Sequence, residues 1–168
     1  MNSILHQNFR KWAINMIGLS NTTGHAVRAL ACLAGCENPP ASIKDIADCA
    51  NVPQPYLAKI VKKLNDSGII DSKRGKQGGI WLARPAKLIS LYDVSVALEG
   101  EDFLGACLLG SGMCSDERDC PTHKFWAKNR ELIRRELEHT KLSDAMEFYH
   151  SQGRVELSTL QDSKEMTR

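Results

Sequence analysis

Apolar residues recur at helical spacing twice within the first fifty positions. Over residues 22–34 they share one helical face, with capping-type residues before it and Gly35 after it. That face consists of Ala26, Val27, Leu30, Leu33 and Ala34. The sequence Ser42-Ile43-Lys44-Asp45 resembles a capping box, and the short apolar face behind it ends around Ala50. The pattern therefore predicts two helices here.

A third helix is predicted after only a brief turn at Asn51-Val52. Pro53 and Pro55 suit its first turn, where a missing N–H costs little, and the apolar period continues to Gly68. The period is formed by Tyr56, Leu57, Ile60, Val61 and Leu64. Because so short a turn joins the second and third helices, we expect a helix-turn-helix.

Two short apolar runs then flank a basic, glycine-rich turn. The runs are Ile69-Ile70 and Ile80-Trp81-Leu82, and the turn spans residues 71–79. A hairpin in this place is typical of a winged helix, whose wing brings Arg and Lys to a phosphate or a minor groove. The glycines alone would also fit a phosphate cradle, but neither a P-loop nor a Rossmann pattern is present.

The second half of the chain predicts two more helices and a loop. Residues 90–100 form a short capped helix that ends at glycine, and Pro121 opens a long helix over residues 122–149. A near-heptad stripe runs along the long helix to about His139 and comprises Phe125, Trp126, Ile133, Leu137 and Thr140. Such a stripe fits either a core face or a dimer seam. The predicted fold class is mainly α with a small β wing, a winged helix-turn-helix plus a long dimerisation helix.

These elements divide the chain into five parts. Residues 19–100 form the predicted DNA-binding domain and residues 101–123 a cysteine-rich loop, followed by the helix of residues 122–149. Residues 150–168 are polar and read as a flexible tail. Residues 1–18 are an N-terminal extension that is either an added amphipathic packing helix or the product of an overextended reading frame.

Composition narrows the class of protein. With 168 residues, of which 42% are hydrophobic and 25% charged, the chain can bury one sizeable core. No apolar run approaches the roughly 18 residues that a membrane span requires, and polar residues interrupt any secretion signal. We therefore expect a cytoplasmic protein without a membrane partner. In a reducing compartment its six cysteines are expected to be metal-binding, redox-active or buried rather than disulfide-bonded.

The net charge of +2 conceals an asymmetry between two segments. Residues 56–87 carry eight basic against two acidic side chains, whereas residues 88–121 carry one basic against seven acidic ones. The basic segment is suited to a polyanion, although simple solvation also explains a lysine-bearing helix face. The residues expected to contact DNA are Gln54, Tyr56, Lys59, Lys62 and Lys63 on the third helix, and Arg74 and Lys76 on the wing.

Four metal-ligand residues fall within seventeen positions. Cys107, Cys114, Cys120 and His123 have the spacing C-x6-C-x5-C-x2-H in a loop rich in Gly, Ser and Asp. Three thiolates and an imidazole suit zinc or an iron–sulfur cluster, and the wide intervals favour the cluster over a zinc knuckle. Ordinary reduced thiols in a loop are the alternative. The other cysteines, Cys32, Cys36 and Cys49, are expected to be small buried hydrophobic side chains.

Together these features resemble the family of winged-helix iron–sulfur transcription regulators that includes IscR, NsrR and RirA. The resemblance runs from about Leu19 to His139. It rests on Leu19-Ser20, Ala26-Val27-Arg28-Ala29-Leu30, Val52-Pro53 with Tyr56-Leu57, Lys73-Arg74-Gly75 with Gly78-Gly79, Ile89-Ser90-Leu91-Tyr92-Asp93-Val94 and the cysteine triad. It implies a homodimer that binds a partly palindromic double-stranded DNA operator through the third helix and the wing, with one cluster per subunit.

The family's ligand positions match this chain unevenly. Cys107, Cys114 and Cys120 match its three cysteine ligands, with one residue more in the first gap than in many members. His123 matches the histidine of IscR-like members, which hold a 2Fe-2S cluster, whereas the carboxylate that other members use is replaced here by Gly24. The resemblance thus favours 2Fe-2S, with 4Fe-4S as the alternative. Arg74 corresponds to a minor-groove arginine, but Ala58-Lys59 replace the Glu-Gln of IscR, so operator preference does not transfer.

We therefore expect a DNA-binding transcriptional regulator, a repressor and not an enzyme, that senses redox state, nitric oxide or iron–sulfur status through a bound cluster. A cluster-free thiol or zinc sensor that also binds DNA is the nearest alternative. An iron–sulfur electron carrier or assembly protein is an alternative from another class. The basic wing and the lack of a second cofactor motif argue against that class.

Overall fold

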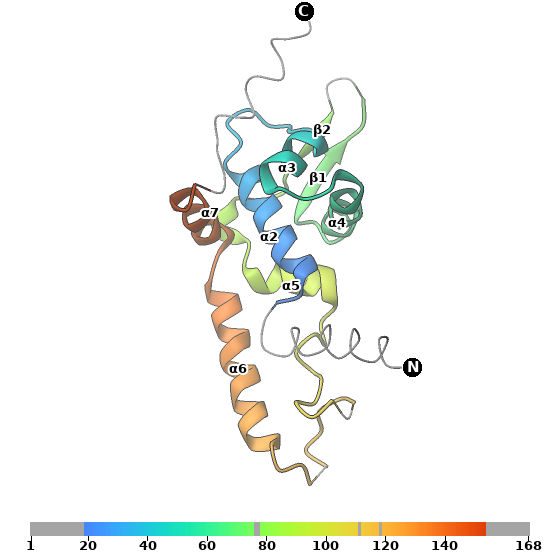
Figure 1. Ribbon diagram of the computed structural model, residues 1–168, viewed down its shortest axis with the longest axis vertical. Helices are drawn as coiled ribbons and strands as arrows, with labels where there is room; N and C mark the ends of the chain where they lie inside the picture. The colour runs from blue at the N-terminus through green and yellow to red at the C-terminus, as the bar shows by residue number, and fades with distance from the viewer. Residues whose placement is uncertain (1–18, 76–77, 111, 118, 154–168) are drawn as a thin grey trace, which may run out of the picture.

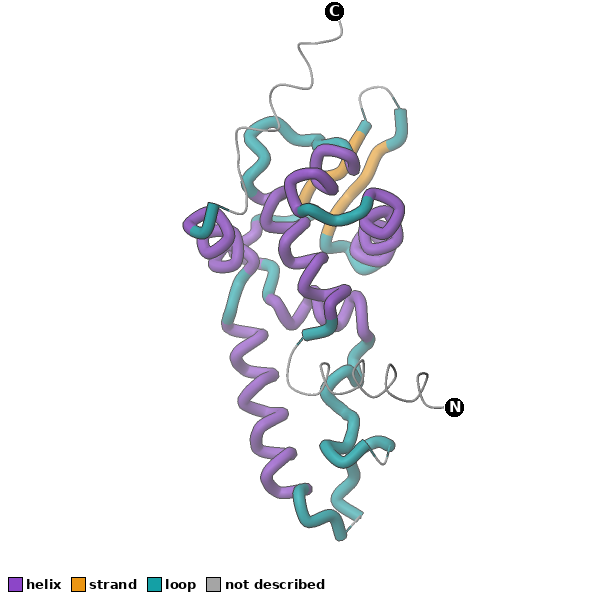
Figure 2. Tube along the Cα trace, viewed as in Figure 1, coloured by secondary structure: helices purple, strands orange, loops and turns teal. Residues whose placement is uncertain are grey.

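The computed structural model describes residues 19–75, 78–110, 112–117 and 119–153, and its elements form an upper head and a long lower arm (Figure 1). In chain order they are α2 (Asn21–Ala34), α3 (Ile43–Ala50), α4 (Gln54–Asp66), β1 (Ile70–Lys73), β2 (Gly79–Leu82), the 3-10 turn η1 (Ala86–Leu88), α5 (Leu91–Glu99), α6 (His123–His139) and α7 (Leu142–Ser151). Figure 2 shows that helices dominate and that a single hairpin supplies the strands among the described residues. The predicted fold class is confirmed.

Local capping by serine explains where three helices of the head begin. The Ser20 hydroxyl accepts a hydrogen bond from the Thr23 N–H, and Ser42 accepts one from Asp45. At α5, Ser90 and Asp93 exchange both hydrogen bonds of a capping box. Each bond satisfies a backbone donor that the first helical turn leaves unpaired. For this reason the predicted helix starts lie within a residue or two of the observed ones.

The wing is an antiparallel hairpin attached to the head. Ile70 lies opposite Leu82 and Lys73 opposite Gly79. Two backbone hydrogen bonds of 3.0 and 2.8 Å join Ala41 to Ile80, so the loop before α3 fastens the outer strand to the head. A side chain at Gly78 would overlap the carbonyl oxygen of Lys73, which explains the glycine there. The tip, including Lys76, lies outside the described residues.

Helix α2 forms the centre of the core. It contacts α3, α4, α5, β2 and α7. The largest fully buried side chains come from nearly all of these elements: Leu30, Ile46, Leu57, Ile60, Leu64, Ile69, Ile70, Ile89, Leu142 and Val94. Residues separated by more than one hundred positions therefore share one hydrophobic core.

The segment predicted as one long helix over residues 122–149 consists of two helices. Helix α6 ends at His139, Thr140 is extended, and α7 begins at Leu142. The Leu91 N–H donates to the Thr140 carbonyl at 3.0 Å, and the Leu142 N–H donates to Ile89 at 2.8 Å. The chain turns between the two helices, which allows these bonds and the complete burial of Leu142. As a result, α7 packs against α2.

Helix α6 is less buried than the helices of the head. No residue of α6 is fully buried, and Phe125 and Leu132 are exposed on it. The extension of residues 1–18 and most of the predicted tail lie outside the described residues, while residues 150 and 151 still belong to α7. No helix within the described ranges is long and apolar enough to cross a membrane.

Candidate functional site

On α4, four of the five residues predicted to contact DNA are exposed. Leu57, Ile60, Val61 and Leu64 point inward, and Gln54, Lys59, Lys62 and Lys63 are exposed. The Lys62 ammonium lies 2.7 Å from Asp66, but both side chains are mostly exposed. Such a surface ion pair contributes little to stability, and a phosphate competes readily for the lysine.

Two of the predicted residues of α4, the half-buried Tyr56 and the exposed Lys63, contact neighbouring helices. The hydroxyl groups of Tyr56 and Thr22 share a hydrogen bond of 2.8 Å, and the Tyr56 ring lies edge-on to His25. The Lys63 ammonium donates to the Leu98 carbonyl at 2.9 Å, near the C-terminus of α5. Helix periodicity places Tyr56 in the apolar period and Lys63 beside the outer face, and only the packed structure shows that the two residues connect α4 to α2 and α5.

The strands of the wing lie beside α4, which contacts β1 (Figure 1). Arg74 is exposed at the end of β1. The Ser72 hydroxyl donates to the Asn65 amide oxygen at 3.0 Å and thereby ties β1 to α4. An exposed cation beside an exposed helix face suits a nucleic-acid backbone.

Arg84 braces the base of the wing against α5. Its guanidinium donates to the Gly68 carbonyl at 3.2 Å, and to the carboxylate of Asp93 at 3.1 Å. Burial alone raises the pKa of Asp93. The hydrogen bonds from Ser90 and Arg84 and the charge of Arg84 outweigh it and hold that pKa below its ordinary value.

The cysteine loop runs alongside α6, away from the head (Figure 1). Within it the Cys107 N–H donates to the Gly112 carbonyl and the Cys114 N–H to that of Gly105, both at 2.8 Å. The Trp126 indole of α6 donates to the Ala106 carbonyl at 2.7 Å. The loop is thus folded on itself and is hydrogen-bonded to α6 through Trp126.

His123, the first residue of α6, lies between a thiol and a carboxylate. Its Nδ1 atom is 3.3 Å from the sulfur of Cys114, and its Nε2 atom is 2.7 Å from the carboxylate of Asp116. The His123 side chain is 17% exposed. Metal-ligating histidines have this arrangement, in which a carboxylate orients one ring nitrogen and the other faces the ligand group. In the sequence, Asp116 counted only as one of the acidic residues of the loop. Its position two residues after Cys114 was the one feature that could have indicated a role beside the predicted metal ligands.

The structure brings the predicted ligands Cys114 and His123 together. Cys107 is buried, and the sulfur of Cys120 lies 3.4 Å from the Thr122 hydroxyl. In the described ranges no three Cys, His, Asp or Glu side chains are arranged to hold a metal ion. None of the three loop cysteines is in a disulfide, so three thiols and an imidazole remain as a donor set that fits the chemistry of an iron–sulfur cluster.

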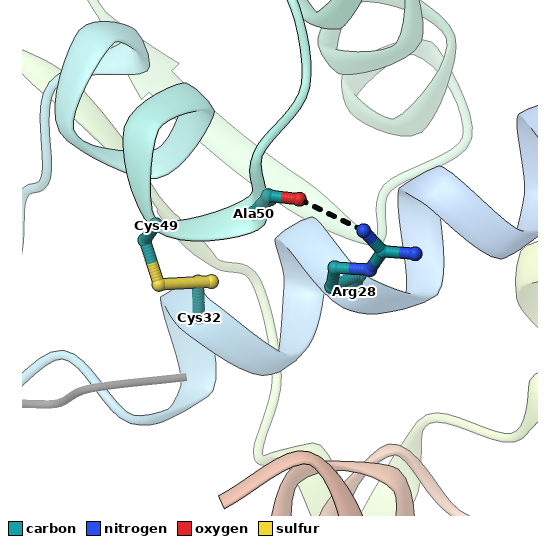
Figure 3. Close-up of a disulfide and its surroundings, with 4 residues drawn as sticks. All are labelled: Arg28, Cys32, Cys49 and Ala50. Carbon is teal, nitrogen blue, oxygen red and sulfur yellow. Dashed lines mark hydrogen bonds between the residues drawn. A yellow bond between two sulfur atoms is a disulfide. The ribbon is translucent and has the colours of Figure 1, made fainter. Parts of the chain in front are cut away.

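The cysteines of the head require a correction. Cys32 is fully buried as expected, but it forms a disulfide with Cys49, with a Cα–Cα distance of 6.3 Å (Figure 3). The expectation of unbonded thiols was therefore wrong for this pair. Cys32 on α2 and Cys49 on α3 meet because the two helices pack face to face, which their positions in the sequence do not reveal. Cys36 keeps a free thiol.

A winged helix with an exposed basic face, joined to a cysteine loop on a protruding helix, defines a DNA-binding regulator. The profile of the Rrf2 family, described as iron-dependent transcriptional regulators, matches residues 19–147. The chain belongs to the Rrf2 family of DNA-binding transcriptional regulators. The family resemblance recognised from the residues is thereby confirmed.

Individual relatives agree with this assignment. An HTH-type transcriptional regulator of Aquifex aeolicus (strain VF5) is 30% identical over 128 residues, covering 74% of this chain and 88% of the relative. The structure of IscR from T. potens superposes with a TM-score of 0.64 at 26% identity, over 80% of this chain and 90% of that one. The oxidised form of CymR from Staphylococcus aureus gives a TM-score of 0.60 at 31% identity, over 77% and 96%.

Proposed function

We propose that this Rrf2 regulator is a repressor that senses redox state, nitric oxide or iron–sulfur status through an iron–sulfur cluster held by Cys107, Cys114, Cys120 and His123. The observation that carries the proposal is the position of His123 between Cys114 and Asp116. A carboxylate at Nε2 favours the tautomer whose proton is on Nε2, which leaves the lone pair of Nδ1 facing the thiol. An imidazole held in this way is prepared for a metal.

The match of His123 to the histidine of IscR-like members favours a 2Fe-2S cluster over 4Fe-4S. Either cluster takes four protein donors, which three thiolates and one imidazole provide. When bound, such a cluster supplies a one-electron redox couple whose potential depends on its ligands and hydrogen bonds. The residues of this chain hold the loop in place: Trp126 anchors it to α6, and Asp116 orients His123.

DNA binding is assigned to the outer face of α4 and to the wing. Gln54, Lys59 and Arg74 are exposed, which supports a role for the first two in the major groove and for Arg74 at phosphate or in the minor groove. The exposed Phe125 and Leu132 of α6 supply an apolar seam for a homodimer, which would present two such heads to a partly palindromic operator.

Three contacts connect the loop to α4, the proposed recognition helix of the helix-turn-helix. Trp126 joins the loop to α6, Leu91 of α5 bonds to Thr140 at the far end of α6, and Lys63 of α4 bonds to Leu98 of α5. A change in the loop that shifts α6 is therefore passed to α5 and then to α4. This gives the cluster a physical route to DNA affinity.

The test is anaerobic purification followed by absorbance spectroscopy and by assays of iron and acid-labile sulfide. The native protein should be coloured and contain both elements. Cys114→Ala and His123→Ala should remove or destabilise the chromophore, whereas the control Cys36→Ala should retain it. His123→Cys should keep a cluster of lower potential, because a thiolate stabilises oxidised iron better than a neutral imidazole. Native protein with stoichiometric zinc and no sulfide would refute the cluster.

A second candidate is a DNA-binding thiol or zinc sensor without a cluster. It is favoured by the lack, in the described ranges, of three Cys, His, Asp or Glu side chains arranged to hold a metal ion, and by the likeness to the oxidised form of CymR. The same purification separates the two functions, because colour and sulfide belong to the cluster alone.

A further inference from the structure

The helix-turn-helix contains a covalent link that the cluster proposal does not use. The disulfide between Cys32 and Cys49 joins the central helix α2 to α3, the first helix of the helix-turn-helix (Figure 3). It lies in the head, whereas the cysteine loop lies alongside α6 in the lower arm (Figure 1). The chain therefore has two groups of cysteines in two separate places.

A hydrogen bond reinforces this link at the same end of α3. Arg28 precedes Cys32 by one helical turn, and its guanidinium donates to the Ala50 carbonyl at 3.2 Å. Since Ala50 directly follows Cys49, the covalent bond and the hydrogen bond hold the last turn of α3 against one face of α2, as Figure 3 shows.

The position of that last turn affects the recognition helix. Asn51 ends α3 in the left-handed conformation, the Val52 N–H donates to the Ala47 carbonyl at 2.9 Å, and α4 begins at Gln54. With so short and hydrogen-bonded a turn, α4 cannot tilt freely while the end of α3 is fixed. A constraint on Cys49 is thus a constraint on the helix that carries Lys59.

We propose that Cys32 and Cys49 form a second redox-active site, a reversible dithiol and disulfide pair that tunes DNA affinity from within the helix-turn-helix. Its oxidant is a low-molecular-weight disulfide. The site acts whether or not the loop holds a cluster, and so it does not rest on the proposed function.

The exchange balances in two steps. The half-buried Cys49 is the accessible partner, since Cys32 is fully buried. The Cys49 thiolate attacks one sulfur of the small disulfide, whose S–S bond breaks and releases one thiolate. The Cys32 thiolate then attacks the Cys49 sulfur and displaces the second small thiolate. The two cysteines lose two electrons and two protons in total, and the small disulfide becomes two thiols.

The oxidised form should bind DNA more tightly. The disulfide is compatible with the winged-helix fold, so it restricts motion between α2 and α3 without distorting the head. The helix-turn-helix then loses less conformational entropy when α4 docks on DNA. We expect an affinity at least about fivefold higher than that of the dithiol form, the lower end of coupling between linked sites.

The experiment uses the full-length chain with Cys107, Cys114 and Cys120 replaced by alanine, so that neither a cluster nor a loop thiol contributes. The DNA probe is a duplex that the wild-type protein selects from a randomised library. Dissociation constants are measured by fluorescence anisotropy after treatment with glutathione disulfide or with glutathione. Peptide mass mapping reports which cysteines are joined.

Two variants in this background separate the pair from its neighbour. Cys49→Ser should abolish both the bridge and the difference in affinity. Cys36→Ser should keep both, although Cys36 is only four positions from Cys32 and lines a hollow with Pro39 and Trp81 that a small disulfide can reach. Circular dichroism verifies that each variant is folded. The same comparison is made with the loop cysteines present. The difference between the wild type and Cys49→Ser in their change of DNA affinity on oxidation is a second, independent measure of the effect of the bridge.

Either of two results would overturn the proposal. One is equal DNA affinity for the bridged and reduced forms. The other is glutathione attached to Cys36 in place of the bridge. A wild-type protein that proves colourless and free of iron would refute the cluster while leaving every arm of this test valid.

Discussion

Truncation of Leu142 tests the turn that separates α6 from α7. Leu142 is 0% exposed, and its N–H donates to Ile89 at 2.8 Å, so it anchors the returning chain in the core of the head. Leu142→Ala removes apolar carbon worth roughly 2 to 3 kcal/mol by transfer at about 0.8 kcal/mol per methylene. The cavity left behind adds to this, giving an expected loss of about 3 to 4 kcal/mol in the free energy of unfolding.

Leu88→Ala is the matched control, because it is the same chemical change at a side chain that is 59% exposed. It should cost less than about 1 kcal/mol. The assay is urea and thermal unfolding followed by circular dichroism at one protein concentration, since association shifts apparent stability. A loss of 3 kcal/mol corresponds to a fall in Tm of roughly 6 to 12 °C for a domain of this size. Equal losses for Leu142→Ala and Leu88→Ala would refute the packing of α7 on the head.

Three further predictions concern DNA binding and pH. Arg74→Ala should flatten the dependence of log affinity on log salt by about one unit, whereas Lys87→Ala, exposed outside the wing, should not; an unchanged slope would remove Arg74 from the interface. Lys63→Met should reduce the effect of loop-cysteine substitutions on DNA affinity, and Lys62→Met should leave that effect intact; an undiminished effect in Lys63→Met would break the proposed route. Because the pKa of Asp93 is lowered by folding, its ionised form stabilises the fold above the unfolded value of about 3.9, and the gain disappears as pH falls through the folded value. The stability difference between wild type and Asp93→Asn in urea should therefore shrink from pH 7 to pH 3, and a constant difference would contradict this role.

Much of the head could be predicted from the sequence because its signals are local. A capping serine and the residue three positions later interact within one turn, and an apolar period of 3.6 residues defines a face that the core must bury. The hairpin with its glycine-rich turn is also a short-range pattern. These signals were sufficient for a winged helix and for the basic face of α4. The spacing of Cys107, Cys114, Cys120 and His123 marked the loop in the same way.

The tertiary structure decided what depends on contacts between distant segments. The near-heptad stripe also ends near His139, but the break there follows from the pairing of residues 140–142 with residues 89–91, which only the fold shows. The contact between Lys63 and Leu98 and the bond between Cys32 and Cys49 arise where helices pack across 35 and 17 positions. Sequence alone determined which residues could form helices, a wing and a donor set, because those properties belong to short stretches of chain. Only the packed core decided which side chains are exposed on α4, which hold neighbouring helices, and which thiols meet, because distance in space is set by the whole fold.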